Sequence, residues 1–238
     1  MFKSWRLGRV LGFPVEVNLS FLLLLAFVLL AYGGLAGVVV VLVAFGSVLL
    51  HELGHAVVAR KLGVHVTGIE LSFFGGAAKM AQMPRRASDE IAIAAAGPAV
   101  SLVLGGLGLG LGILTRSPLV AMFGSINFVI AAFNLIPALP MDGGRILRAA
   151  LAYKLDYVRA TDISVVVARV FTVIFAVAGL AFGMWQLLLL APFLWMMTSA
   201  EQRNAHAAAH DWADERHPQM QRFVIVQRGG RMVIEPLD

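Results

Sequence analysis

The chain contains no cysteine, and charged residues make up only 14% of its 238 residues. Without cysteine it can form neither a disulfide nor a thiolate metal site. Soluble domains carry about 25% charged residues, and hydrophobic residues here reach 59%. Such a composition predicts a membrane protein.

The formal net charge of +5 does not indicate nucleic-acid binding. Nucleic-acid interfaces typically combine a basic face with interleaved aromatic side chains, and the sequence has no such pattern. In an apolar chain, basic residues in loops more often set the orientation in the membrane. We therefore expect this protein to lie in a lipid bilayer and to bind no nucleic acid.

Six apolar segments are long enough to cross a bilayer, which takes about 20 residues. They cover approximately residues 14–32, 35–59, 88–114, 118–140, 160–182 and 183–200. Basic residues gather before the first segment and after the second, fourth and sixth, whereas the other connections hold only Arg116. Because cytoplasmic loops are rich in Lys and Arg, we expect a multi-pass protein of the plasma membrane with cytoplasmic N- and C-termini.

The first segment has an alternative interpretation as a signal peptide covering residues 1–30. The stretch AYGGLAG is a poor cleavage site, and Pro14, Glu16 and Asn18 interrupt the apolar pattern. We therefore favour a retained membrane segment.

Two stretches have strand-like sequences. Residues 64–83 contain β-branched and aromatic residues with partial alternation around Gly75 and Gly76, which predicts a β-hairpin or small sheet at the cytoplasmic interface; a loop is the alternative. Near the C-terminus, RFVIVQRGGRMVIE has two strand-like runs around a Gly-Gly turn. The expected fold is an all-α polytopic membrane protein with six transmembrane helices and a small interfacial β-hairpin or sheet. Its core comprises residues 1–200, and residues 201–238 form a cytoplasmic tail with a helix and a short hairpin.

The second apolar segment contains the sequence HELGH. On a helix, His51 and His55 project from one face and can bind one metal ion. Zinc suits two imidazoles plus one carboxylate, with a further position left for water. Glu52 follows the first histidine and can act as the general base for that water. The motif also occurs by chance in helices, but three titratable groups inside a membrane segment are costly and favour a site.

A third protein ligand is needed, and Asp142 in FNLIPALPMDGGRILR lies at the same expected depth as HELGH. The alternative is that Asp142 caps the helix that follows it. Pro137 and Pro140 break the apolar segment, so its backbone could pair with an extended substrate. Asn134 could hold the substrate backbone through its amide, or it could bond between helices.

HELGH together with NLIPALPMDGG resembles the site-2 protease family of intramembrane zinc metalloproteases. FFGG and AAAGPAVS resemble the hairpin and the AGP-containing segment of the same family, and the resemblance covers roughly residues 10–155. It implies a six-span core, one Zn²⁺ per chain held by His51, His55 and Asp142, and Glu52 as the general base. Many members have Asn a few residues after AGP, where this chain has Ser101.

The resemblance also implies hydrolysis of a peptide bond in or near the transmembrane segment of a membrane-anchored protein, such as a membrane-tethered transcription regulator or its anchor. Gly75, Gly76 and the segment near Asn134 would contact this substrate. One alternative is a metal transporter with His and Asp as transit ligands, but a transporter has no need of Glu52. Another is a catalytically inactive homologue, which the presence of every reacting group disfavours.

A second metal-like pattern follows the sixth segment. His206 and His210 are four residues apart, with Asp214 and His217 beyond them. No glutamate follows His206, and the stretch is polar, so we interpret it as a solvated helix in preference to a metal site.

Overall fold

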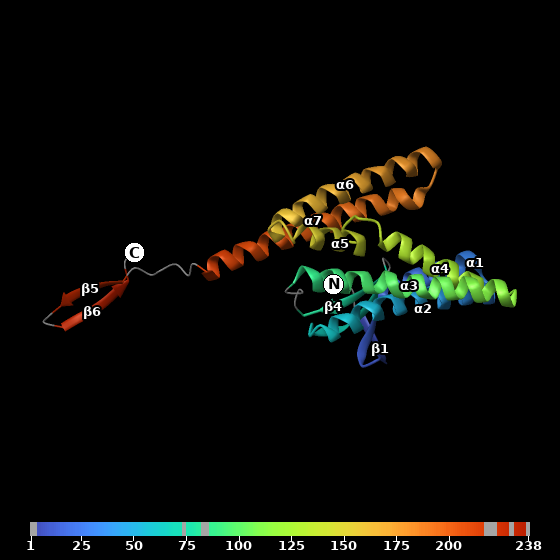
Figure 1. Cartoon of the computed structure of the whole chain (residues 1–238), viewed down its shortest axis with the longest axis horizontal. Coiled ribbons are helices and arrows are strands. Elements are labelled where there is room, and N and C mark those ends of the chain that lie inside the picture. The colour runs from blue at the N-terminus through green and yellow to red at the C-terminus, as the bar shows by residue number, and fades with distance from the viewer. Residues whose placement is uncertain (1–3, 73–74, 82–85, 217–222, 229–230, 237–238) are drawn as a thin grey trace.

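The computed structural model describes residues 4–72, 75–81, 86–216, 223–228 and 231–236. This part of the chain is mostly helical, with a small sheet near the N-terminus and a separate hairpin near the C-terminus (Figure 1). The helices are α1 Leu19–Tyr32, α2 Gly34–Lys61, α3 Ala87–Thr115, α4 Pro118–Asn134, α5 Asp142–Leu151, α6 Tyr157–Phe182 and α7 Trp185–Arg216. The strands are β1 Ser4–Val10, β2 Phe13–Asn18, β3 Val66–Ser72, β4 Gly75–Met80, β5 Phe223–Arg228 and β6 Arg231–Pro236.

The first four strands form one sheet in the order β1-β2-β3-β4. β1 and β2 are antiparallel, as are β3 and β4, whereas β2 and β3 are parallel. The hairpin expected in residues 64–83 is thus confirmed as β3 and β4. The first apolar segment was placed too early, because residues 14–18 belong to β2. The alternation of buried and half-buried residues in FPVEVN is the period of a strand.

The sheet packs against the second half of α2. Phe13, Val15 and Val17 of β2 form one buried cluster with Leu53 and Ala56 of α2, which Ile69 and Leu71 of β3 complete. Burying these apolar side chains fixes the sheet on the helix that carries HELGH.

The other face of the sheet carries a ladder of charges. Glu16 and Glu70 lie opposite one another on the parallel strands β2 and β3, where two carboxylates would repel. Lys79 of β4 bridges them, at 3.3 Å from Glu16 and 2.6 Å from Glu70, and Arg6 of β1 bonds Glu16 at 3.1 Å. The hydrogen bond from Arg6, followed in importance by the one from Lys79, lowers the pKa of Glu16. The hydrogen bond to Glu70 is the main cause that raises the pKa of Lys79. These bonds connect β4 to the N-terminal strands.

Close contact between α3 and α4 depends on small residues. A Cβ added at Gly108 would lie 2.6 Å from the Cα of Gly124, and one at Gly112 would lie 2.7 Å from the Cα of Ala121. Membrane helices commonly approach one another through such residues, as expected from the glycine-rich third apolar segment.

α5 is held between α3 and α7 by one buried arginine. Arg148 donates to Glu90 of α3 at 3.0 Å and to Glu201 of α7 at 3.2 Å. Thr198 of α7 donates to the carbonyl of Leu139, in the segment that leads into α5. The end of α5 is therefore tied to α3 and α7, and the segment that leads into α5 is tied to α7, while α6 and α7 form a hairpin alongside it (Figure 1).

Within the described residues, three helices are long and apolar enough to cross a membrane: Ala36–Lys61, Ala87–Thr115 and Tyr157–Phe182. α4 is shorter than the predicted segment 118–140, because the helix ends at Asn134, before Pro137 and Pro140. α7 is longer than predicted and continues from the sixth apolar segment into the tail as far as Arg216. The predicted C-terminal hairpin is present as β5 and β6.

Candidate active site

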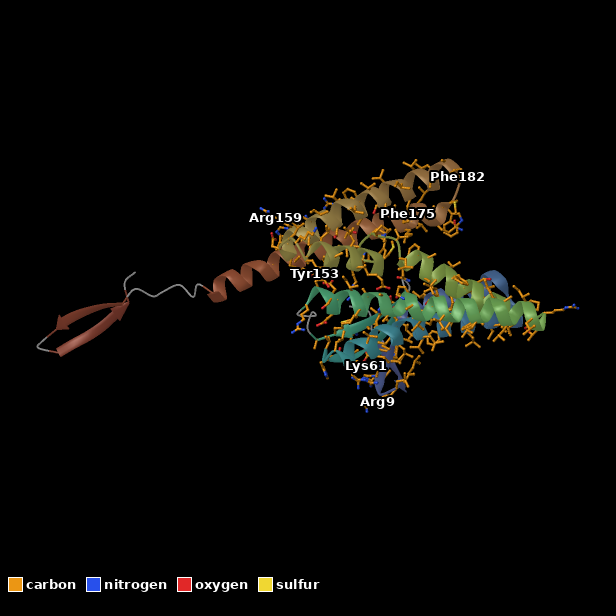
Figure 2. All side chains as sticks on the ribbon, in the orientation of Figure 1. Arg9, Lys61, Tyr153, Arg159, Phe175 and Phe182 are labelled. Carbon is orange, nitrogen blue, oxygen red and sulfur yellow. The ribbon has the colours of Figure 1, made fainter. Side chains whose placement is uncertain are left out.

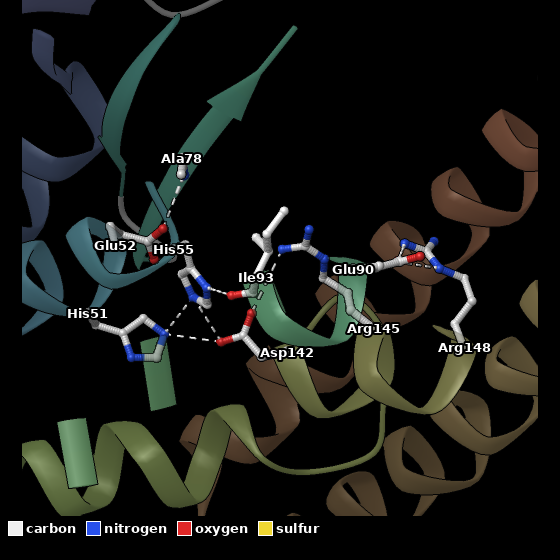
Figure 3. Close-up of polar contacts among 9 residues, drawn as sticks. All are labelled: His51, Glu52, His55, Ala78, Glu90, Ile93, Asp142, Arg145 and Arg148. Carbon is white, nitrogen blue, oxygen red and sulfur yellow. Dashed lines mark hydrogen bonds and ion pairs between the residues drawn. The ribbon is translucent and has the colours of Figure 1, made fainter. Parts of the chain in front are cut away.

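α2 and α5 bring the three expected metal ligands together (Figure 3). The Nε2 atom of His51 lies 3.1 Å from Oδ2 of Asp142, and Nε2 of His55 lies 3.2 Å from the same oxygen. The two Nε2 atoms are 3.2 Å apart. All three side chains are buried. Met141, and not Asp142, occupies the N-cap position of α5, so the capping alternative is wrong.

The opposite nitrogens of both imidazoles have oxygen partners. Nδ1 of His55 lies 2.7 Å from the carbonyl of Ile93, and Nδ1 of His51 lies 2.9 Å from the hydroxyl of Ser101. A carbonyl can only accept, so Nδ1 of His55 carries the proton, and a neutral His55 has a free lone pair on Nε2. That lone pair points at the carboxylate of Asp142 and at the second imidazole. A cation bound by His51, His55 and Asp142 would offset the repulsion between their lone pairs.

The donor set fits zinc. A tetrahedral zinc ion with bonds of about 2.0–2.1 Å separates its ligand atoms by about 3.3 Å, and the three separations here are 3.1–3.2 Å. A carboxylate oxygen of Glu52 also lies within 4.8 Å of the histidine donors. Asp142 makes the tighter set, which leaves Glu52 beside the site.

Glu52 has its own support from β4. The backbone N–H of Ala78 donates to its Oε2 at 3.1 Å. Gly76 lies directly against the Glu52 side chain, where an added Cβ would overlap Cγ and lie 2.9 Å from Cδ. The sheet thus fixes the direction of a buried carboxylate.

Gly97 is a site residue that the sequence reading did not single out. It lies in the AGP segment of α3, where an added Cβ would overlap Nε2 of His55 and lie 2.7 Å from Nε2 of His51. Only a glycine leaves the space for both imidazoles. The sequence AAAGPAVS was the available signal, and Ser101 of the same stretch bonds His51.

A pocket with a volume of about 160 Å³ opens next to His55 and Asp142. The predicted substrate residues Asn134, Pro140 and Gly76 line it together with Glu52 and Arg145. The residues that complete its wall are His55, Ala77, Ala78, Met80 and Asp142.

Of the predicted substrate residues, Pro137 and Gly75 are not part of the pocket lining, and Asn134 also bonds within its own helix. Pro137 is exposed in the segment between α4 and α5, and Gly75 begins β4 next to Gly76. Asn134 donates one amide hydrogen to the carbonyl of Ile130, one turn back in its own helix.

The second histidine pattern is separate from this site. Nε2 of His206 lies 3.0 Å from Oδ1 of Asp162 on α6, and both side chains are partly exposed. The side chains of His210 and Asp214, and the whole of His217, lie outside the described residues. An ion pair accounts for His206.

Comparison with known proteins identifies the family. The model of peptidase family M50 matches residues 38–117 and 113–177, more than half of the chain. The chain belongs to this family. Zinc metalloprotease MJ0392 of Methanocaldococcus jannaschii is 35% identical over 85% of this chain and 62% of its own length. The protein sll0528 of Synechocystis is 40% identical over 63% of this chain and 44% of its own length. The chain thus spans between 44% and 62% of the length of these relatives.

A solved structure supports the same assignment. The site-2 protease from Methanocaldococcus jannaschii superimposes with a TM-score of 0.68 and 34% sequence identity, covering 84% of this chain and 95% of that one. The family resemblance inferred from HELGH and NLIPALPMDGG is therefore confirmed, and this M50 chain has a site-2 protease fold.

Proposed function

We propose that this chain is an intramembrane zinc metalloprotease that hydrolyses a peptide bond within or near the transmembrane segment of a membrane-anchored protein. One observation carries the proposal: two imidazole nitrogens and one carboxylate oxygen converge within 3.2 Å, with Glu52 beside them. Membership of peptidase family M50 supports the same chemistry.

In this proposal His51, His55 and Asp142 hold one Zn²⁺ per chain. When bound, the zinc ion polarises a carbonyl and lowers the pKa of a water molecule. Glu52 takes a proton from the attacking water and returns it to the leaving amine. The N–H of Ala78 holds one oxygen of Glu52, so the other oxygen is available for that proton.

The substrate is proposed to bind in the pocket beside the ligands as an extended chain. Carbonyl groups in an intact helix are hydrogen-bonded and shielded, so the substrate helix has to unwind locally. Gly75 and Gly76 on β4, and Asn134, Pro137 and Pro140 on the other side, are the proposed substrate contacts. A membrane-tethered transcription regulator or its anchor has the required single membrane segment.

Co-expression with a panel of single-span proteins tests the function directly. We expect at least one of them to be cleaved in or near its membrane segment when the unmodified chain is present, and to stay intact with Glu52→Gln. Cleavage that is equal with both forms would refute the proposal.

The proposed membrane arrangement has six spans, a core of residues 1–200 and a tail of residues 201–238, with both termini in the cytoplasm. Two features support it. β2 and β3 lie side by side in one sheet, so α1 and α2 must lead away from it and back. The basic residues Arg9 and Lys61 flank these helices at the sheet, and Arg159 lies in the first turn of α6, at the end opposite Phe182 (Figure 2).

Reporter fusions check this orientation. Fusions after Lys61, Lys154 and Arg203 should report cytoplasm, and fusions near Arg116 should report the outside, because Lys and Arg accumulate in cytoplasmic loops. An external signal after Lys61 would overturn the proposed orientation of the active site.

Gly97→Ala is expected to abolish zinc binding, because the new Cβ overlaps His55 and crowds His51. We expect the zinc content of the purified variant, measured by mass spectrometry, to fall about tenfold or more. Gly106→Ala is the matched control on the same helix, since nothing lies within 4 Å of its added Cβ. Full zinc occupancy in Gly97→Ala would contradict the proposed ligand geometry.

A further inference from the structure

Two arginines one turn apart on α5 have very different surroundings. Arg148 is buried and bonded to Glu90 and Glu201, with its guanidinium also 5.1 Å from the ring centre of Tyr157. Arg145 has one ion pair among the described residues, in which Nη1 lies 3.9 Å from Oδ1 of Asp142. That distance is too long for a hydrogen bond. With respect to the described residues, the guanidinium of Arg145 therefore keeps its donors available.

Arg145 also has a distinctive position. It lines the pocket with Glu52 and Asp142, and it is the only permanently charged cation among the lining residues in the described part of the chain. The two oxygens of Asp142 face different ways, with Oδ2 at the histidines and Oδ1 toward Arg145. Figure 3 shows the guanidinium on the side of Asp142 away from His51.

A charged group that is largely removed from water is costly unless it is paired or used. Arg148 meets this condition through two carboxylates, whereas Arg145 has only the long contact to Asp142 within the part of the chain that the structure describes. The planar fork of a guanidinium is suited to an oxygen that gains negative charge. Peptide hydrolysis produces such an oxygen in a pocket of this kind.

We propose that Arg145 is a catalytic residue that donates hydrogen bonds to the carbonyl oxygen of the scissile peptide bond as that oxygen becomes an oxyanion. The inference rests on the proposed protease function. The water oxygen bonds to the carbonyl carbon, the C=O π pair moves onto the oxygen facing Arg145, and Glu52 takes the water proton. The C=O bond then re-forms, the C–N bond breaks with its electron pair on nitrogen, and Glu52 returns the proton to that nitrogen.

The test uses the full chain in detergent with fluorescein-labelled casein, an unstructured protein whose peptide bonds need no unwinding. Loss of one oxyanion donor lowers kcat by about 10²–10³-fold, and we expect Arg145→Ala to show this loss with one zinc per chain retained. Arg145→Lys should recover only part of the rate, because an ammonium lacks the planar fork. Guanidinium chloride at millimolar concentration should restore activity to Arg145→Ala, and sodium chloride at the same concentration should not.

Two further measurements separate this role from a structural one. A peptidyl phosphonate copies the tetrahedral oxyanion, so Arg145→Ala should weaken its binding by about 10²-fold, while binding of labelled casein in a Glu52→Gln background stays unchanged. Arg159→Ala is the matched control, since Arg159 is exposed and pairs only with the nearby Asp156 among the described residues. It should leave cleavage unchanged.

A kcat within threefold of the unmodified chain, absence of rescue by guanidinium, or loss of zinc from Arg145→Ala would overturn the proposal. Failure of the protease function itself has another signature, in which casein is cleaved equally by the unmodified chain and by Glu52→Gln.

Discussion

Glu52→Gln is expected to retain one zinc ion per chain and to lose cleavage activity by about 10²–10⁴-fold, the usual contribution of a general base. The amide has the shape of the carboxylate, and its oxygen can still accept from the N–H of Ala78. It cannot take a proton from water. Metal analysis of the purified variant, beside cleavage of a single-span protein or of labelled casein, measures both quantities.

Asp156→Asn is the matched control for this exchange. Asp156 is the N-cap of α6 and accepts from the backbone of Arg159, a bond that an asparagine can also make. We expect its activity and zinc content to be unchanged. Full activity in Glu52→Gln would contradict the protease mechanism, whereas loss of its zinc would make Glu52 a metal ligand.

Asp142→Ala should lower zinc affinity and activity together, because it removes the only anionic oxygen within 3.2 Å of both histidines among the described residues. Conserved partners of metal ligands already contribute 10–100-fold to affinity, so we expect a loss of about 100-fold or more for a direct ligand. Isothermal titration calorimetry of the metal-free variant with zinc measures this loss of affinity.

Asp142→Ser separates the ligand role from a helix-start role. A serine is well tolerated at the start of a helix but supplies no carboxylate, so it should fail in the same way as alanine. Thermal unfolding of the metal-free forms shows whether the fold persists. A serine variant with full zinc occupancy and normal cleavage would refute the assignment of Asp142.

The local part of the site could be predicted from the sequence. The spacing of His51 and His55 places both side chains on one helical face. Asp142 was predicted as their partner because it lies at the same expected depth in the membrane. Contacts between residues that are distant along the chain could not be predicted as readily, because the sequence carries weaker signals for them. Gly97 was not identified because its role depends on how closely α3 passes the two imidazoles. Arg145 was not identified because the position of its partner oxygen depends on where the fold places Asp142.

The fold was predicted in outline, and the errors occurred where apolar composition does not distinguish a strand from a helix. The first segment was extended over residues 14–18 although only Val15 and Val17 are aliphatic there, and their alternation with Glu16 and Asn18 is the period of strand β2. The pairing of β2 with β3 joins segments that are distant along the chain, and no local pattern encodes it. The end of α4 is a simpler case, since the prolines that follow it restrict the backbone.

The parallel pairing of β2 and β3 also orders the assembly of the protein during synthesis. All of α1 and α2 lies between these strands. β2 therefore cannot pair with β3 until both helices and Val66–Ser72 have left the ribosome. Through that interval Phe13, Val15 and Val17 lack their partners on β3. A nascent chain arrested before Val66 therefore already contains HELGH but lacks β4, whose Gly76 and Ala78 direct Glu52.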